Sequence, residues 1–312
     1  NSNDSKINVM ICLDEETEKL HQKDLKKDAV VMKGSSDNMY YVGRVFKLLC
    51  MEFEDLEREL KELKNFDENI KSAKMGYDEE KEVLYKLTPL KKKLFFGTGS
   101  QSIAAGAIDS GLDFYCAYPM TPASPILGEL ADKQIDKNFI ILELESEISV
   151  IGTAIGTAMT GAKAMVGTSG GGYDLMTEFV SMTGMAEIPL VIYLAQRPGP
   201  STGLPTYTGQ GDLQLARHSG HGEFQRTIFA PGDINECQEL ISQAFYFSQK
   251  YKIPSIVLSD KHLAESSYTQ TELPKLIHSE KSTSLKKYNS YEHDENGIVT
   301  EDAEIVNKNF EK

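Results

Sequence analysis

Between residues 114 and 259 the sequence alternates short apolar stretches with longer segments of helical spacing. The apolar stretches, which we predict to be strands, are 114–118, 139–143, 164–168, 190–195 and 255–259. The segments that we predict to be helices are 124–133, 146–160, 175–187 and 237–251. Short buried strands that alternate with helices are typical of a parallel sheet covered on both faces. The sequence therefore predicts an α/β fold with a doubly wound parallel sheet.

The residues on either side of this region have a different composition. Residues 1–93 are rich in Lys, Glu and Asn, whereas the tail 269–312 is polar and acidic, with few apolar residues to build a core. We therefore divide the chain into a first domain with its linker (1–93), a central domain (94–268) and an acidic arm (269–312).

Within the first domain the apolar spacing changes from strand-like to helical. We predict a strand at 9–13, a helix from Asp14, and two helices between residues 40 and 63 that join near Cys50. The stretch 87–93 contains a proline and three lysines, and we interpret it as a linker.

Composition limits the class of partner. The chain has 33 Lys and Arg against 47 Asp and Glu, a net charge of −14, whereas nucleic acids and anionic membranes attract basic surfaces. No apolar run reaches the length of about 18 residues that a membrane-spanning helix needs, and no signal-peptide pattern is present at the first residues. The four cysteines form no Cys-x-x-Cys pair. We expect a cytoplasmic protein that binds neither nucleic acid nor membrane.

Unusual sequences follow four of the predicted strands. They are Pro119-Met-Thr-Pro122, Glu145-Ser-Glu147, Ser169-Gly-Gly-Gly172 and Gln196-Arg-Pro-Gly-Pro200. Ligands of open α/β sheets bind beyond the carboxyl ends of the strands. Because the carboxyl ends of parallel strands meet at one edge, these four sequences are expected to converge on one site.

Three side chains in these sequences are candidates for binding or catalysis. Thr121 lies between two prolines that stiffen its backbone, although the stretch also suits a helix start with Ser124 as the cap. Glu147 opens a helix rich in small residues, although an acid at a helix N-terminus is common for stability alone. Arg197 precedes Pro198-Gly-Pro200 and suits bidentate binding of a carboxylate, with a structural ion pair as the alternative.

Two glycine-rich turns suggest other chemistry. Ser169–Gly172 could cradle a phosphate, but the absence of Gly-Lys-Ser/Thr excludes a P-loop. Gly97–Ser102 begins like a dinucleotide fingerprint but has Ser102 where the third glycine belongs. Both turns are also typical of tight strand-to-helix connections. His218 and His221 have no evident further metal ligands, so no metal site is predicted.

Six stretches in order carry a resemblance to a known family. They are Tyr118-Pro-Met-Thr-Pro122, Glu145-Ser-Glu147, Gly167-Thr-Ser-Gly-Gly-Gly172, Gln196-Arg-Pro-Gly-Pro-Ser-Thr-Gly-Leu-Pro-Thr206, Gly209-Gln-Gly-Asp212 and Gly220-His-Gly-Glu-Phe224. The chain resembles the α subunit of a 2-oxoacid:ferredoxin oxidoreductase, and more closely the 2-oxoglutarate type with a γ-like domain fused at its N-terminus. The likeness is continuous over 97–268 and weaker over 7–78.

The resemblance implies thiamine diphosphate-dependent oxidative decarboxylation of a 2-oxoacid with coenzyme A, and electron transfer through a [4Fe-4S] cluster to ferredoxin. Residues 94–268 would be the domain that binds the aminopyrimidine ring of the cofactor. Glu147 matches the glutamate that hydrogen-bonds this ring, and Thr121 and Arg197 match contacts to the substrate carboxylate. The remaining cofactor contacts are expected from Tyr118, Pro119, Gly170, Gly171 and Gly172.

This chain departs from the family pattern at several points. Gly171 replaces a usual proline, and Ser100-Gln101 replaces Asn-Glu. The Gly-Asp-Gly motif that binds diphosphate and Mg²⁺ and the cluster cysteines are missing, so a β subunit is expected to supply both. The γ-like part lacks its glycine-rich start and no second α/β domain follows Lys312, as in a truncated or gapped version of a longer protein.

Two other readings remain open from the sequence. One is a non-catalytic assembly or regulatory subunit, which the replaced motif positions permit, although the joint presence of Thr121, Glu147 and Arg197 argues against it. The other is a nucleotide-binding α/β enzyme that uses Gly97–Ser102. The preferred 2-oxoacid is not specified, because residues of another subunit can contact its distal group.

Overall fold

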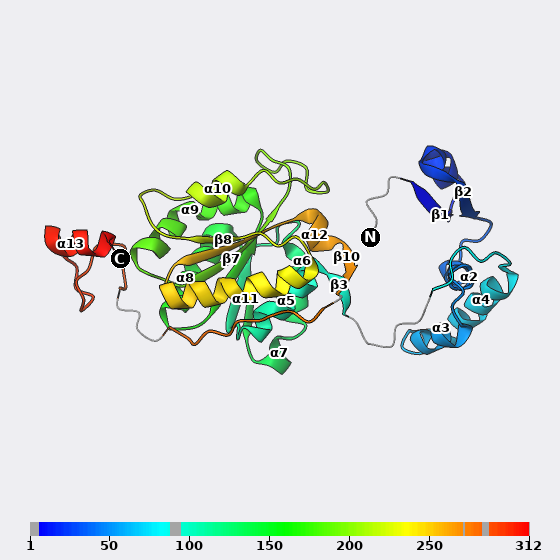
Figure 1. Ribbon diagram of the computed structural model, residues 1–312, viewed down its shortest axis with the longest axis horizontal. Helices are drawn as coiled ribbons and strands as arrows, with labels where there is room; N and C mark the ends of the chain where they lie inside the picture. The colour runs from blue at the N-terminus through cyan, green and yellow to red at the C-terminus, as the bar shows by residue number, and fades with distance from the viewer. Residues whose placement is uncertain (1–5, 88–94, 271, 283–286, 312) are drawn as a thin grey trace. The chain divides into compact units, whose positions relative to one another are not determined.

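A computed structural model describes residues 6–87, 95–270, 272–282 and 287–311. The chain forms two compact units, which comprise residues 1–93 and 94–312 (Figure 1). The predicted linker, apart from Leu87, lies outside the described residues. Among the described residues, no helix combines the length and the apolar character needed to cross a bilayer.

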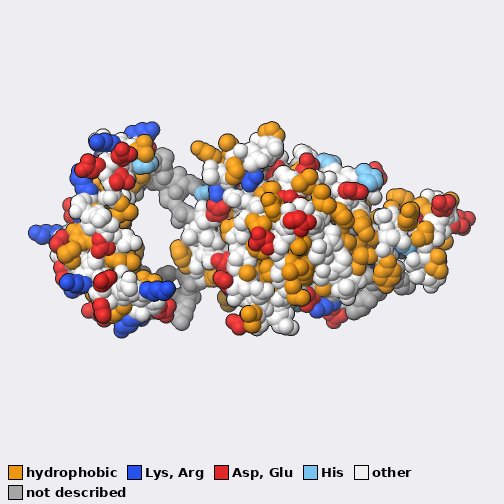
Figure 2. Space-filling model, turned by 180° about the vertical axis from the view of Figure 1, so that it is seen from behind, with side chains coloured by type: hydrophobic (Ala, Val, Ile, Leu, Met, Phe, Trp, Pro, Cys, Tyr) orange, Lys and Arg blue, Asp and Glu red, His pale blue; other side chains and the backbone are white. Residues whose placement is uncertain are grey.

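The negative charge is unevenly divided between the two units. Residues 1–93 contain 18 basic and 20 acidic residues, whereas residues 94–312 contain 15 basic and 27 acidic residues. On the face visible in Figure 2, most of the Lys and Arg side chains accordingly lie on the first unit. The second unit therefore carries nearly all of the net negative charge.

The first unit combines a two-stranded parallel sheet with helices. Its elements are β1 (Ile7–Ile11), α1 (Glu15–His21), η1 (Gln22–Asp24), β2 (Leu25–Met32), α2 (Asn38–Leu48), α3 (Phe53–Leu60) and α4 (Phe66–Glu79). The predicted break near Cys50 is confirmed, because α2 ends and α3 begins on either side of it. The first strand lies two residues earlier than predicted.

Helices α2 and α4 pack with their backbones in close contact. A Cβ atom on Gly43 would overlap the carbonyl oxygen of Ala73, and a Cβ atom on Gly76 would overlap that of Tyr40. Each glycine thus faces the backbone of the opposite helix, where no side chain fits. The contact also buries Ala73 completely.

We expect Gly43→Ala to destabilise the first unit by about 1–3 kcal/mol, the usual cost of inserting a methyl group into a well-packed contact. Hydrogen exchange of peptides from α2 and α4 should accelerate. Gly128→Ala is the matched control, because a Cβ atom there meets nothing within 4 Å, and alanine should be neutral or stabilising. Equal exchange in the wild type and the Gly43 variant would contradict this packing.

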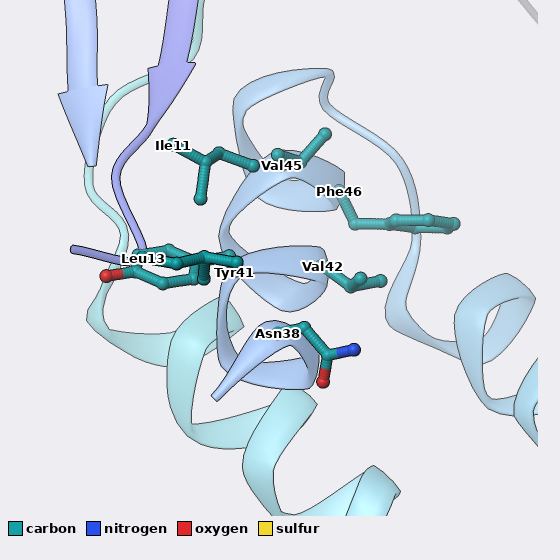
Figure 3. Close-up of a pocket in the computed structure, with 7 residues that line it drawn as sticks. All are labelled: Ile11, Leu13, Asn38, Tyr41, Val42, Val45 and Phe46. Carbon is teal, nitrogen blue, oxygen red and sulfur yellow. The ribbon is translucent and has the colours of Figure 1, made fainter. Parts of the chain in front are cut away.

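The first unit also has an apolar hollow of about 390 Å³ between the end of β1 and one side of α2 (Figure 3). Its lining residues are Ile11, Leu13, Asn38, Tyr41, Val42, Val45 and Phe46. None of them carries a carboxylate, amine, imidazole or guanidinium group. The hollow therefore lacks the acid–base groups of the predicted site, whose residues all belong to the second unit.

The second unit is built on a six-stranded sheet with the order β5-β4-β6-β7-β9-β8, in which all neighbours are parallel. The strands are β4 (Phe114–Ala117), β5 (Ile140–Glu143), β6 (Ala164–Thr168), β7 (Leu190–Gln196), β8 (Thr227–Phe229) and β9 (Pro254–Asp260). The predicted α/β fold with a parallel sheet is confirmed. Of these six strands, only β8 was not predicted from the sequence.

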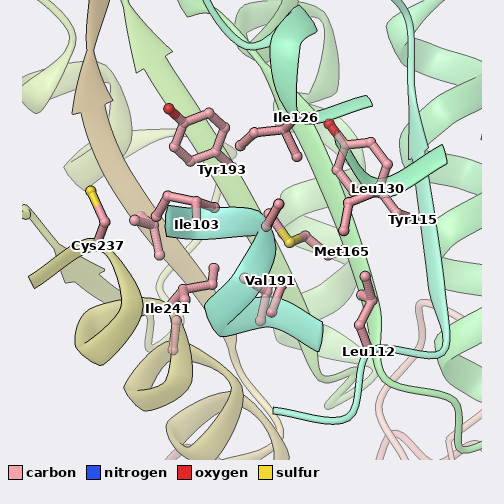
Figure 4. Close-up of a cluster of buried hydrophobic side chains, with 14 of the residues drawn as sticks. Ile103, Leu112, Tyr115, Ile126, Leu130, Met165, Val191, Tyr193, Cys237 and Ile241 are labelled. Carbon is pink, nitrogen blue, oxygen red and sulfur yellow. The ribbon is translucent and has the colours of Figure 1, made fainter. Parts of the chain in front are cut away.

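Helices cover both faces of this sheet, as the doubly wound prediction requires. The main helices are α5 (Gly99–Asp109), α6 (Ser124–Ala131), α8 (Glu147–Met159), α9 (Gly170–Met185) and α11 (Ile234–Tyr251). One buried cluster joins α5, α6 and α11 to one face (Figure 4), and a second joins α8 and α9 to the other. Met165 and Val166 belong to different clusters because successive side chains of a strand point to opposite faces.

Several smaller elements complete the second unit. They are β3 (Phe96–Thr98), α7 (Gln134–Lys137), α10 (Leu213–His218), α12 (Lys261–Glu265), β10 (Ser267–Thr269) and α13 (Ala303–Phe310). After β10, the chain continues as an extended segment that runs alongside α11. There the backbone N–H groups of Lys275 and Ser282 donate to Glu239 and Gln249 of the helix, both at 2.8 Å. This part of the predicted acidic arm is therefore held against the domain.

Candidate active site

The predicted site residues lie where the order of the strands reverses. The chain passes from β4 to β5 in one direction, and then crosses back to β6 on the other side of β4. The segments that follow β4, β5, β6 and β7 therefore meet at the carboxyl ends of β4 and β6. Such a switch point is the usual ligand site of an open α/β sheet.

The structure brings Thr121 and Arg197 together. One terminal nitrogen of the Arg197 guanidinium, Nη1, donates a 2.6 Å hydrogen bond to the carbonyl oxygen of Thr121. Arg197 is 9% exposed, and within the described part of the chain no carboxylate lies within 4 Å of it. The described residues thus offer no partner for the structural ion pair considered above. A buried guanidinium without a counter-ion is costly, and an incoming carboxylate would relieve this cost.

The segment around Thr121 differs from the sequence prediction in one detail. Helix α6 begins at Ser124, and its N-cap is Ala123, whose side chain makes no capping hydrogen bond. The predicted cap at Ser124 is therefore wrong by one residue, because the proline that follows Ser124 continues the first helical turn. Tyr118 and Pro119, at the start of the same segment, are exposed at the end of β4, and Tyr118 is 40% exposed.

Glu147 is a buried acid at the carboxyl ends of the strands. It is the first residue of α8 and is 3% exposed, whereas Glu145 is exposed and bonds the Ser149 hydroxyl. Its Oε1 atom is shut off from solvent and accepts no hydrogen bond. Buried carboxylate oxygens are nearly always hydrogen-bonded, so an orphaned one indicates a missing donor.

Gly170, Gly171 and Gly172 form the first turn of α9, which begins five residues earlier than predicted. A Cβ atom on Gly172 would lie 2.5 Å from Oε1 of Glu147, so this contact requires glycine. Gly171 is exposed, and a Cβ atom there would be 3.4 Å from its nearest neighbour. A proline, which the family pattern considered above has at this position, would fit the first turn of a helix.

Asp212 and Gln196 lie in stretches that the sequence analysis singled out, but neither side chain was assigned a role in the site. The Asp212 carboxylate lies against Gly170, with Oδ2 2.5 Å and Oδ1 2.7 Å from where a Cβ atom would be. Oδ2 is shut off from solvent without a hydrogen-bond partner, and burial raises the pKa of this carboxyl group. The Asp212 N–H donates to Gln196, which in turn donates to the carbonyl of Ser259. The only available signal was the place of Asp212 at the end of a Gly-Gln-Gly-Asp stretch.

The Gly220–Phe224 stretch, in contrast, has a structural role. The hydroxyl groups of Tyr173 and Ser219 are 2.6 Å apart, and Arg226 donates to Ser219 at 2.6 Å while its guanidinium lies 4.2 Å from the ring centre of Phe224. These contacts fix the segment against α9. Across the described ranges, no three His, Cys, Asp or Glu side chains are grouped as metal ligands.

A doubly wound sheet with a buried glutamate and a buried arginine at its switch point places the chain among the α/β proteins whose usual ligand site lies at this point of the sheet. Residues 105–311 match the family model described as pyruvate flavodoxin/ferredoxin oxidoreductase, thiamine diphosphate-binding. This match covers well over half of the chain, and the chain belongs to that family. The resemblance drawn from the six motifs is thereby confirmed.

Named relatives agree with this assignment. The chain is 38% identical over 167 residues to the 2-oxoglutarate synthase subunit KorA of Methanothermobacter marburgensis. The matched region covers 54% of this chain and 44% of the relative. It is 37% identical over 245 residues to the 2-oxoacid:ferredoxin oxidoreductase 1 subunit alpha of Sulfurisphaera tokodaii, covering 72% of this chain and 37% of the relative. The chain thus spans less than half the length of these two relatives.

A solved structure shares the fold. The 2-oxoglutarate:ferredoxin oxidoreductase from Magnetococcus marinus, determined with 2-oxoglutarate, coenzyme A and succinyl-CoA bound, matches with a TM-score of 0.83 and 22% sequence identity. The match covers 99% of this chain and 68% of that chain. At this level of identity the likeness supports the fold alone.

Proposed function

We propose that this chain is the α subunit of a 2-oxoacid:ferredoxin oxidoreductase that acts on 2-oxoglutarate. Such an enzyme converts the 2-oxoacid and coenzyme A to the acyl-CoA and CO₂, and passes two electrons to ferredoxin. The observation that carries the proposal is the Glu147 carboxylate, which is buried at the switch point with an oxygen that has no partner. The names of the relatives supply the preference for 2-oxoglutarate.

The residues present fit thiamine diphosphate. The orphaned Oε1 of Glu147 needs a hydrogen-bond donor, and a protonated ring nitrogen of the aminopyrimidine is such a donor. Gly170 and Gly172 make room for the carboxylates of Asp212 and Glu147, and the exposed Gly171 between them leaves the backbone open to close approach of a ring. Tyr118 and Pro119 are the further contacts that we assign to the cofactor, at the end of β4.

Each side chain then has a defined task. Thiamine diphosphate, when bound, supplies the nucleophilic carbon and the electron sink for loss of CO₂. Glu147 holds and exchanges a proton with the ring nitrogen, which is general acid–base catalysis. Arg197 and the Thr121 hydroxyl bind the carboxylate of the 2-oxoacid, and the hydrogen bond from Arg197 to the Thr121 carbonyl keeps the two groups together.

A partner subunit completes the site in this proposal. We assign to a β subunit the diphosphate and Mg²⁺ contacts and the [4Fe-4S] cluster, because the sequence carries no motif for either. The large excess of acidic residues in the second unit also disfavours a diphosphate site on this chain alone. Coenzyme A and ferredoxin are the remaining reactants.

We expect the isolated chain to bind thiamine diphosphate weakly or not at all, and the complex with its β subunit to bind it and turn over 2-oxoglutarate. Calorimetry on the isolated chain measures cofactor binding, and a ferredoxin-reduction assay on the reconstituted complex measures turnover. Micromolar cofactor binding by the isolated chain would contradict the shared site. A complex that assembles without turning over any 2-oxoacid would favour the non-catalytic assembly subunit instead.

A further inference from the structure

The first turn of α9 has two features of an anion-binding site, which are free backbone N–H groups and the N-terminus of a long helix. Gly170, Gly171 and Gly172, at the N-terminus of this 16-residue helix, have no side chains of their own to cover its first backbone N–H groups. The N-cap residue, Ser169, makes no capping hydrogen bond with its side chain. Free N–H groups and the helix dipole together favour phosphate at such a position, as the sequence of the turn also suggested.

Two carboxylates already flank this turn. The Asp212 carboxylate lies against the first glycine of the helix and the Glu147 carboxylate against the third, each with an oxygen 2.5 Å from where a Cβ atom would be. Glu147 is 97% buried, being 3% exposed, and each acid has one oxygen that is shut off from solvent without a partner. An incoming phosphate would meet two negative charges beside the N–H groups.

Asp212 is held in this place by buried contacts. Its N–H donates to Gln196 at 3.0 Å, and Gln196 is anchored at 3.1 Å to the carbonyl of Ser259 in the neighbouring strand. Asp212 also precedes α10, but its carboxylate makes no capping bond to that helix. Within the described residues no Lys, Arg or His lies within 4 Å of it. Its carboxylate therefore lies against α9 without a counter-ion among the described residues.

We propose that Asp212 is a specificity-determining residue that closes the N-terminus of α9 to phosphate groups and leaves this end of the site to a ring that donates hydrogen bonds. A cofactor that carries both a ring and a diphosphate can then bind to this chain only through its ring. That consequence for thiamine diphosphate rests on the proposed function, whereas the exclusion of phosphate does not.

The test uses the full 312-residue chain without any partner, at about pH 8, several units above the ordinary pKa of a carboxyl group. Inorganic pyrophosphate is titrated by calorimetry into the wild type and into Asp212→Asn, which keeps the shape of the side chain and removes its charge. We expect the variant to bind pyrophosphate at least about 10-fold more tightly than the wild type. Asp212→Ser, a smaller uncharged side chain, should show the same gain, and it decides the matter if circular dichroism shows that the asparagine variant is misfolded.

Asp113→Asn is the matched control for charge. Asp113 precedes β4, at the amino end of the sheet, where it pairs with Lys281 at 2.8 Å and accepts from the N–H of Lys163. The substitution Asp113→Asn removes one unit of charge at a place away from α9, and it should leave pyrophosphate binding unchanged. Equal affinities of the wild type and the Asp212 variants, or an equal gain in the Asp113 variant, would overturn the proposal. Failure of the proposed function would appear separately, as absence of turnover by the wild-type complex.

Discussion

Replacing Glu147 by glutamine is expected to cut turnover of the reconstituted complex at least about 100-fold, the usual scale for the loss of an acid–base group. Glutamine preserves the shape of the side chain but cannot exchange a proton. Because Oε1 of Glu147 has no hydrogen-bond partner in the isolated chain, the substitution breaks no contact there. The melting temperature should therefore stay the same or rise, since a desolvated charge is removed. Steady-state reduction of ferredoxin and thermal unfolding measure the two effects.

Glu145→Gln is the control for this substitution. Glu145 lies two residues earlier, is exposed and accepts a hydrogen bond from the Ser149 hydroxyl, so the same chemical change occurs on the solvent side of the site. We expect the complex with this variant to keep most of its activity. Near-normal turnover by Glu147→Gln, or an equal loss in both variants, would remove Glu147 from its assigned role.

The convergence of the site could be predicted from the sequence because it depends on a general property of parallel sheets. Every strand of such a sheet ends at the same edge, so the residues after the predicted strands had to meet there. The strand order, in contrast, depends on which helices pack against which face. Only the structure places the switch point between β4 and β6, beside Glu147.

The start of α9 shows why local propensity fails at such a site. Three successive glycines argue against a helix, since each costs about 1 kcal/mol relative to alanine. The structure nevertheless continues the helix through them. Glycine is required there by contacts from distant parts of the chain, with Glu147 at one position and Asp212 at another. A prediction from neighbouring residues has no access to such contacts.

Strand β8 was missed for a different reason. It has only three residues, Thr227–Phe229, and all are partly exposed at the edge of the sheet. So short a stretch shows neither alternation nor a continuous apolar run. Its pairing with β9 brings it under α11, which packs on both strands, and the three residues alone give no sign of this contact.

Arg197→Ala is expected to lower kcat/KM for the 2-oxoacid about 10- to 150-fold and to leave cofactor binding nearly unchanged. The range corresponds to the loss of about 1.5–3 kcal/mol, which is typical of a hydrogen bond to a charged group. Arg197→Lys should recover only part of the loss, because a point charge cannot reproduce a two-pronged contact with a carboxylate. Stability should change little, since the lost bond to the Thr121 carbonyl is offset by removal of a buried, unpaired charge.

Arg226→Ala separates this role from a structural one. Arg226 is also partly buried, but it bonds Ser219 and packs on the ring of Phe224, so its loss should lower the melting temperature and preserve kcat/KM in the folded fraction. If Arg197→Ala behaved in the same way, Arg197 would be a structural residue and the carboxylate of the substrate would have to bind elsewhere. Melting temperature, cofactor affinity and kcat/KM, measured on the wild type and the three variants, decide between the two roles. If kcat/KM falls in the Arg197 variants and the melting temperature falls in Arg226→Ala, the role of Arg197 is to bind the substrate carboxylate.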